Sequence, residues 1–100
     1  MLAEIHVSPS PAGTPDNRHA HVEAAIAVVE QSGLHYEVGA LGTTFEGDAD
    51  AVWATLRAAH EAVLAAGATS VITSIRLGQR ATDDAPDGVW RMEQLTAKFR

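Results

Sequence analysis

Cysteine is absent from the sequence, basic residues are few, and long apolar runs are missing. The absence of cysteine excludes disulfide bonds, thiolate metal ligands and a cysteine nucleophile. Seven Lys and Arg residues against thirteen Asp and Glu give a formal net charge of -6. This balance disfavours nucleic-acid partners, because binding to a phosphate backbone needs a basic surface. No stretch approaches the roughly 18 apolar residues of a membrane span, so a membrane partner is not predicted either.

Apolar residues are nevertheless plentiful enough for one hydrophobic core. They make up 46% of the 100 residues, a size and content that predict a single domain over residues 1–100. The opening stretch contains Glu4 and His6 and has no basic leader, so it does not resemble a secretory signal. We therefore expect a cytoplasmic protein that is stabilised by packing rather than by cross-links.

Four short segments have the alternation or the composition of β-strands. In the first, Ala3, Ile5 and Val7 alternate with polar residues until the proline-rich stretch that begins at Ser8 interrupts the pattern. The last shows a similar alternation, and the two in the middle are short runs rich in β-forming residues. The predicted strands cover residues 2–8, 35–39, 42–47 and 70–77.

Two longer segments have helical periodicity. The first is expected to begin at Thr14-Pro15-Asp16-Asn17, which combines capping side chains with a tolerated proline, and to end at Ser32-Gly33. The second should begin at Asp48 or Asp50 and end at Ala66-Gly67. Its predicted buried stripe contains Val52, Leu56, Ala59 and Val63. After the acidic linker near Asp83, a short final helix is predicted from the alignment of Val89, Met92, Thr96 and Phe99.

The order β-α-β-β-α-β with a terminal helix predicts an α+β fold of the ferredoxin-like type, built on a four-stranded antiparallel sheet. Two helices cover only one face of such a sheet. The other face would carry alternate residues of the first and fourth strands, namely Glu4, His6, Ser8, Ser70, Ile72, Ser74 and Arg76. This mixed face suits a ligand-binding floor, a sheet-to-sheet contact between subunits, or ordinary exposure to solvent.

Several blocks of sequence, taken in their order and spacing, resemble a known family. The most specific block is Gly42-Thr43-Thr44-Phe45-Glu46-Gly47, and the others are Met1-Leu2-Ala3-Glu4-Ile5, Ser32-Gly33-Leu34-His35-Tyr36-Glu37, and His60-Glu61 before Gly67-Ala68. Over residues 1–80 the chain resembles the MTH1187-type thiamine-binding proteins. It departs from their usual pattern in the proline-rich loop of residues 8–17 and in the acidic linker.

The resemblance implies a ferredoxin-like subunit that assembles into homodimers and commonly homotetramers. It also implies a non-enzymatic protein that binds thiamine or its hydroxymethylpyrimidine moiety, with no catalytic reaction and no required cofactor. An aminopyrimidine ring has one amino donor, two ring acceptors and two flat apolar faces. A pocket for it therefore needs only a few well-placed polar groups.

Six residues are candidates for contacts with such a ligand. Thr43 and Thr44 supply hydroxyl groups, and Glu46, or alternatively Glu4, offers a charge that would offset the thiazolium ring of thiamine. The other candidates, on the predicted open face, are His6, Ser8 and Ser74. Plainer explanations exist as well, because threonine favours strands, an acidic residue favours the start of the next helix, and a histidine on a sheet face is often a packed or interface residue.

Neither a metal site nor a catalytic site is predicted. His19 and His21 are two residues apart, so on a helix they point to different sides. The sequence has no H-E-x-x-H, G-x-S-x-G, Walker or G-x-G-x-x-G motif. The predicted function is therefore small-molecule binding. The alternative is a structural or regulatory homo-oligomer whose open sheet face serves assembly only.

Overall fold

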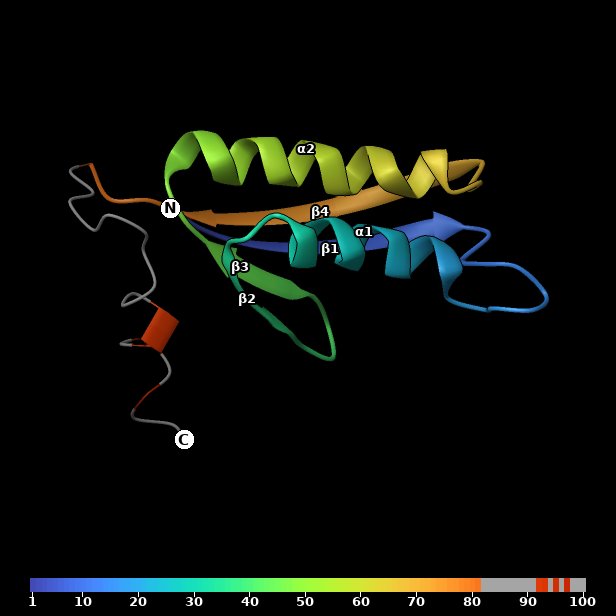
Figure 1. The fold of residues 1–100 in the computed structure, drawn as a ribbon, viewed down its shortest axis with the longest axis horizontal. Coiled ribbons are helices and arrows are strands. Elements are labelled where there is room, and N and C mark those ends of the chain that lie inside the picture. Colours follow the sequence, from blue (N-terminus) through green and yellow to red (C-terminus); the bar gives the residue numbers. More distant parts are fainter. Residues whose placement is uncertain (82–91, 94, 96, 98–100) are drawn as a thin grey trace.

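The computed structural model describes residues 1–81, 92, 93, 95 and 97. Its elements, in chain order, are β1 (Leu2–Ser10), α1 (Ala20–Gln31), β2 (His35–Val38), β3 (Thr43–Glu46), α2 (Ala49–Ala65) and β4 (Ser70–Gly78). The four strands form one sheet in the order β2-β3-β1-β4, and every neighbouring pair is antiparallel. Both helices lie on the same face of this sheet (Figure 1). The predicted α+β ferredoxin-like fold is confirmed.

The strand register confirms which side chains share the open face. Glu4 pairs with Arg76, and His6 pairs with Ser74. Directly paired residues point to the same side of a sheet, so the polar residues of β1 and β4 lie together on the side away from the helices. The predicted separation of the two faces is therefore correct.

The core lies between the sheet and the two helices. Phe45 of β3 has no exposed surface, and Ala3 and Ile5 of β1 are 1% and 4% exposed. The stripe predicted for α2 is buried in full, and it consists of Val52, Leu56, Ala59 and Val63. Helix α1 adds Ala25 and Val29 to the same cluster.

Strand β1 has different neighbours along its length. Its pairing with β3 stops at Ile5, whereas its pairing with β4 continues to Ser10. The second half of β1 therefore has a free edge where β3 has already ended. This edge borders the candidate site described below.

The free edge also explains why β1 is longer than predicted. The main-chain groups of odd-numbered residues in β1 point toward β3, as the hydrogen bond from the Gly47 N–H to the Met1 oxygen (3.1 Å) indicates. The Pro9 nitrogen, which has no hydrogen, therefore points to an edge that has no partner strand, and the ladder loses no hydrogen bond. The strand continues to Ser10 instead of ending at the predicted Ser8.

Helix α1 begins later than predicted. Residues 14–17 form a turn, in which the Thr14 N–H donates to the Asn17 oxygen (2.8 Å) and the Asn17 N–H donates to Thr14 Oγ1 (3.1 Å). Thr14 thus caps a turn and not the helix, which starts at Ala20. Gly13 precedes this turn in a tight space, since a Cβ atom there would lie 2.2 Å from the Asn17 oxygen.

The other helix ends agree with the sequence signals. Asp48 caps α2 by accepting a hydrogen bond from the Ala51 N–H (3.0 Å), and Gly33 follows α1 with a φ of 81°, a conformation that glycine adopts without strain. Met92 and Glu93 are helical. The acidic linker near Asp83 and the other positions of the predicted final helix, Val89, Thr96 and Phe99, lie outside the described residues.

Within the described part of the chain, neither helix combines the length and the apolar character that crossing a bilayer requires.

Candidate ligand-binding site

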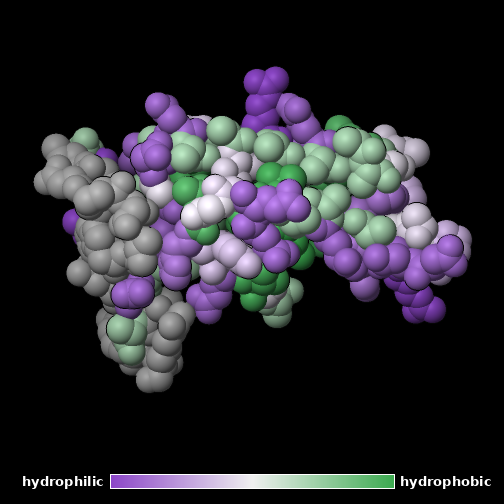
Figure 2. Space-filling view, viewed as in Figure 1, coloured by the Kyte–Doolittle hydropathy of each residue, from purple (hydrophilic) through white to green (hydrophobic). Residues whose placement is uncertain are grey.

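A pocket of about 370 Å³ lies between α1 and the sheet, where the β2–β3 hairpin turns away from β1. We call it the hairpin pocket. The hairpin turns at residues 39–42, with the Gly39 N–H donating to the Gly42 oxygen (2.8 Å). Near this turn the surface is hydrophobic (Figure 2), and Val38 and Leu41 are 50% and 85% exposed. The pocket exists because β3 is short and β1 is long.

The walls of the hairpin pocket are apolar, with a few polar groups among them. Helix α1 contributes Val22 and Ile26, and the hairpin contributes Val38. The polar side chains include Thr43, which is only 5% exposed, and His19 at the start of α1. A concave, mainly apolar space with few polar groups and a volume of this size is typical of small-molecule sites.

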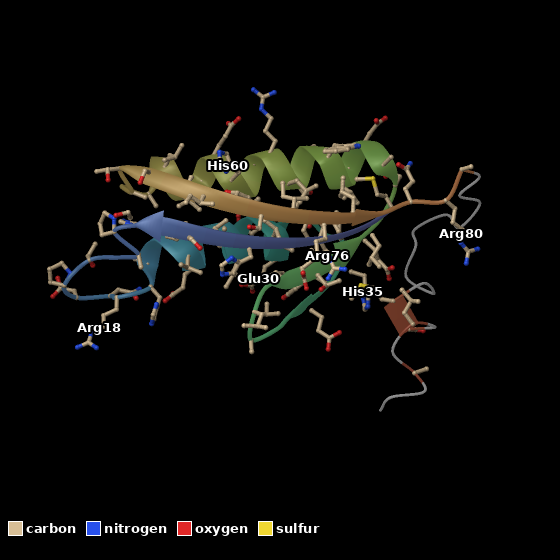
Figure 3. The ribbon with its side chains drawn as sticks, turned by 180° about the vertical axis from the view of Figure 1, so that it is seen from behind. Arg18, Glu30, His35, His60, Arg76 and Arg80 are labelled. Atoms are coloured by element: carbon tan, nitrogen blue, oxygen red, sulfur yellow. The ribbon has the colours of Figure 1, made fainter. Side chains whose placement is uncertain are left out.

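A second hollow, the sheet groove, lies on the open face and measures about 330 Å³. It is lined by polar residues from three strands, because Arg76, Glu4 and Thr44 stand in one cross-strand row. Figure 3 looks onto this face and places Arg76 and His35 at the same end of the sheet. The sheet groove is more open than the hairpin pocket, and Glu4 and Arg76 give it charges of both signs.

The two candidate threonines lie on opposite faces of the sheet. Thr43 pairs with Ile5 and faces the hairpin pocket, whereas Thr44 pairs with Glu4 and faces the sheet groove. Adjacent residues of a strand point to opposite sides, so the two threonine side chains do not face one shared cavity. Only one of them can contact a ligand in either hollow through its side chain.

The candidates of the first and fourth strands are also divided. His6 borders the hairpin pocket at the free edge of β1, although its side chain points to the open face beside Ser74. Ser8 and Ser74 are exposed on that open face and lie outside both hollows. The structure therefore does not assemble the six candidates into one site.

Glu46 has a partner from the other end of the chain. Its side chain is 1% exposed, and Oε2 accepts a hydrogen bond from the Met92 N–H (3.1 Å). Met92 is itself buried, so this contact holds Met92 against β3. Glu46 lies outside both hollows, and the start of α2 is capped by Asp48 instead.

Two histidines considered as metal ligands have separate roles. His21 is 3% exposed, and its Nδ1 lies 2.7 Å from the Pro11 oxygen. A carbonyl oxygen only accepts, so Nδ1 carries the proton in this contact. His19 is exposed and lies at the rim of the hairpin pocket. Among the described residues, no three metal-ligating side chains come together.

A weak signal for His21 is present in the sequence, and there is none for the free edge. A histidine on the apolar stripe of a predicted helix can indicate burial, but its carbonyl partner lies in a loop whose path is not evident from sequence. The edge depends on where β3 stops against β1, which is a property of the register.

The chain matches the profile of a family described as thiamine-binding protein over residues 3–99. A UPF0045 protein of Synechocystis is 43% identical over 60 residues, which are 60% of this chain. That match spans only 50% of the length of the Synechocystis relative.

Two solved structures have the same fold. A domain of unknown function, DUF77, from Bacillus cereus has a TM-score of 0.76 and 33% identity, and the match covers 100% of this chain and 91% of that one. A candidate thiamine biosynthesis or salvage protein of Thermotoga maritima has a TM-score of 0.77 and 21% identity, with 99% and 97% covered. At that lower identity the likeness concerns the fold alone.

Proposed function

This chain belongs to the thiamine-binding protein family, and we propose that it binds thiamine or its hydroxymethylpyrimidine moiety without transforming it. The observation that carries this proposal is the hairpin pocket, a mainly apolar space of about 370 Å³ with few polar groups. A cytoplasmic location, consistent with the composition, is part of the proposal.

The chemistry of the pocket fits a flat heterocycle. Val22 and Ile26 offer apolar surface to the faces of an aromatic ring. The hydroxyl of Thr43 can donate or accept a hydrogen bond at the ring edge. The net charge of -6 favours a cationic ligand over an anionic one. The pocket therefore suits the pyrimidine ring, with the thiazolium ring toward solvent.

Binding without turnover is supported by the geometry of β1. Ser8 and His6 occupy alternate positions of β1 on the open face. Alternate residues of a strand lie about 7 Å apart, which is too far for a base to take the proton of a nucleophile. The family description also names binding and no reaction.

A second candidate function is assembly alone. Strand β4 is an edge of the sheet, and its apolar side chains Ile72, Ile75 and Leu77 are 74%, 43% and 43% exposed. Exposed apolar edge strands favour contact with another chain. We propose that a second copy of this chain covers them in a homodimer or homotetramer. Assembly and ligand binding are compatible, so only a binding measurement separates the two functions.

The test is a thermal-shift and calorimetric titration with thiamine, hydroxymethylpyrimidine and thiamine phosphates. A ligand that binds the native state raises the melting temperature. If no ligand raises the melting temperature at millimolar concentration, binding is rejected and assembly is the function that remains.

Neighbouring threonines provide a matched pair of variants. Thr43→Val removes a hydroxyl from the hairpin pocket, and we expect affinity to fall about threefold to tenfold, the cost of one hydrogen bond. Thr44→Val removes the same group from the opposite face and should bind like the wild type. The reverse pattern would move the site to the sheet groove.

A further inference from the structure

Val7 lines the hairpin pocket on the side of β1. Val7 lies two residues beyond Ile5, where pairing between β1 and β3 stops. Because odd-numbered residues of β1 point their main-chain groups toward β3, the Val7 N–H and C=O point to the free edge that borders the pocket and not to β4. Within the described residues, neither group has a main-chain or side-chain hydrogen-bond partner.

The rest of this free edge offers fewer groups. Pro9, the next residue with the same orientation, has no N–H. The Pro11 oxygen accepts from His21, and the Ala12 oxygen accepts from the His21 N–H (3.0 Å). Val7 is therefore the residue of this edge that presents a donor and an acceptor side by side to the pocket. Unpaired main-chain groups at an apolar wall are unfavourable unless water or a ligand satisfies them.

We propose that the main-chain N–H and C=O of Val7 recognise the ligand by hydrogen bonds to one edge of its ring. This inference rests on the function proposed above and adds the group that selects the ligand. The Val7 N–H donates to a ring nitrogen of the pyrimidine, and the Val7 C=O accepts from the adjacent amino group. The aminopyrimidine thus pairs with the edge of β1 beyond the point where β3 stops, as an added strand would.

The arrangement predicts a specific discrimination. In a 4-oxo analogue the amino group is replaced by a carbonyl and the neighbouring ring nitrogen carries a proton. Donor then faces donor and acceptor faces acceptor at Val7, and both main-chain groups are left unpaired. Two buried, unsatisfied groups reduce affinity by at least about 30-fold. If the ligand were recognised only by its flat faces, the oxo analogue would bind with the same affinity.

Calorimetry with the intact wild-type chain tests the discrimination, using hydroxymethylpyrimidine and its 4-oxo analogue, and thiamine and its 4-oxo analogue. We expect the oxo compounds to bind at least about 30-fold more weakly. Equal affinities would overturn the role of Val7 while leaving the binding function in place. Absence of binding by all four compounds would overturn both.

Amide hydrogen exchange measured by NMR gives an independent readout that needs no variant. The Val7 N–H should exchange at least about tenfold more slowly in the saturated complex, because it acquires an acceptor. The Ile5 N–H, already within the ladder with Thr43, is the internal control and should change little. Unchanged exchange at Val7 in a saturated complex would contradict the proposal.

A pair of proline variants tests the donor directly. Val7→Pro removes the N–H and retains the C=O, and we expect at least about tenfold weaker binding of hydroxymethylpyrimidine. Pro9→Ala restores an N–H on the same edge outside the pocket and should leave affinity unchanged. Circular dichroism and the melting temperature show whether each variant folds. If Val7→Pro does not fold, the exchange measurement on the wild type decides the question.

Discussion

The two halves of β1 differ in their neighbours. Residues 2–5 lie between β3 and β4, whereas residues 6–10 pair with β4 alone. The first half contributes Ala3 and Ile5 to a close-packed core around Phe45. The second half borders a pocket. One continuous strand therefore supplies both core residues and a free edge, because the strands beside it have different lengths.

The largest effect is expected from a cavity in the core beside the first half of β1. Phe45→Ala should lower the free energy of unfolding by about 3–5 kcal/mol, since Phe45 is fully buried. The matched change beside the pocket, Ile26→Ala, should cost only roughly 1 kcal/mol because Ile26 is partly exposed. Urea denaturation of both variants makes the comparison. Similar losses would show that the pocket region is packed as closely as the core.

The next effect concerns the loop that follows the second half of β1. His21→Ala removes the partner of the Pro11 oxygen and a buried ring, and should cost about 1–3 kcal/mol. His19→Ala, two residues away, changes an exposed side chain and should stay within about 0.5 kcal/mol of the wild type. Denaturation midpoints give both values. Equal effects would mean that the His21 contact does not hold the loop.

A smaller effect is expected where the first half meets α2. Asp48→Ala removes the N-cap, whose carboxylate accepts from the Ala51 N–H, and should cost about 1 kcal/mol. Asp50→Ala also removes a negative charge from the first turn but breaks no cap, so its cost should be about 0.3 kcal/mol. Thermal melts at fixed pH compare the two. A larger loss for Asp50→Ala would indicate that charge and not capping stabilises this helix.

The smallest effect lies outside both halves, on the solvent side of α2. Arg57 donates to Glu61 at 2.7 Å, and this hydrogen bond raises the pKa of the Arg57 guanidinium. Both side chains are well exposed, at 81% and 58%, and exposed pairs contribute little. Glu61→Gln should leave the melting temperature unchanged. A clear drop would show that surface charge stabilises α2.

Much of the fold followed from patterns that are local in the sequence. The alternation in residues 70–77 predicted the two faces of β4, and the register confirms it. The helical stripe of α2 was also correct, since Val52 and its companions are buried. These predictions succeeded because each element must bury one side against the same core.

The errors arose where a distant segment decides the local outcome. Pro9 stops a strand only if its N–H is needed, and that depends on the end of β3. Thr14 can cap a helix or close a turn, and the turn was formed. Thr43 and Thr44 were both candidates, although alternation along a strand places their side chains on opposite faces. The pocket itself results from the unequal lengths of β1 and β3, which no short sequence motif indicates.

Gly13 makes the loop beside the pocket uneven in its tolerance of amino-acid substitutions. No side chain fits at this position, because a Cβ atom would lie within 2.5 Å of main-chain atoms of Asn17 and Arg18. The five positions that follow it, residues 14–18, are all exposed. A saturation library would thus show one position that rejects every replacement, followed by five that accept most of them. Variants of this loop can alter the approach to His19 and to the hairpin pocket without disturbing the sheet, provided that the glycine is retained.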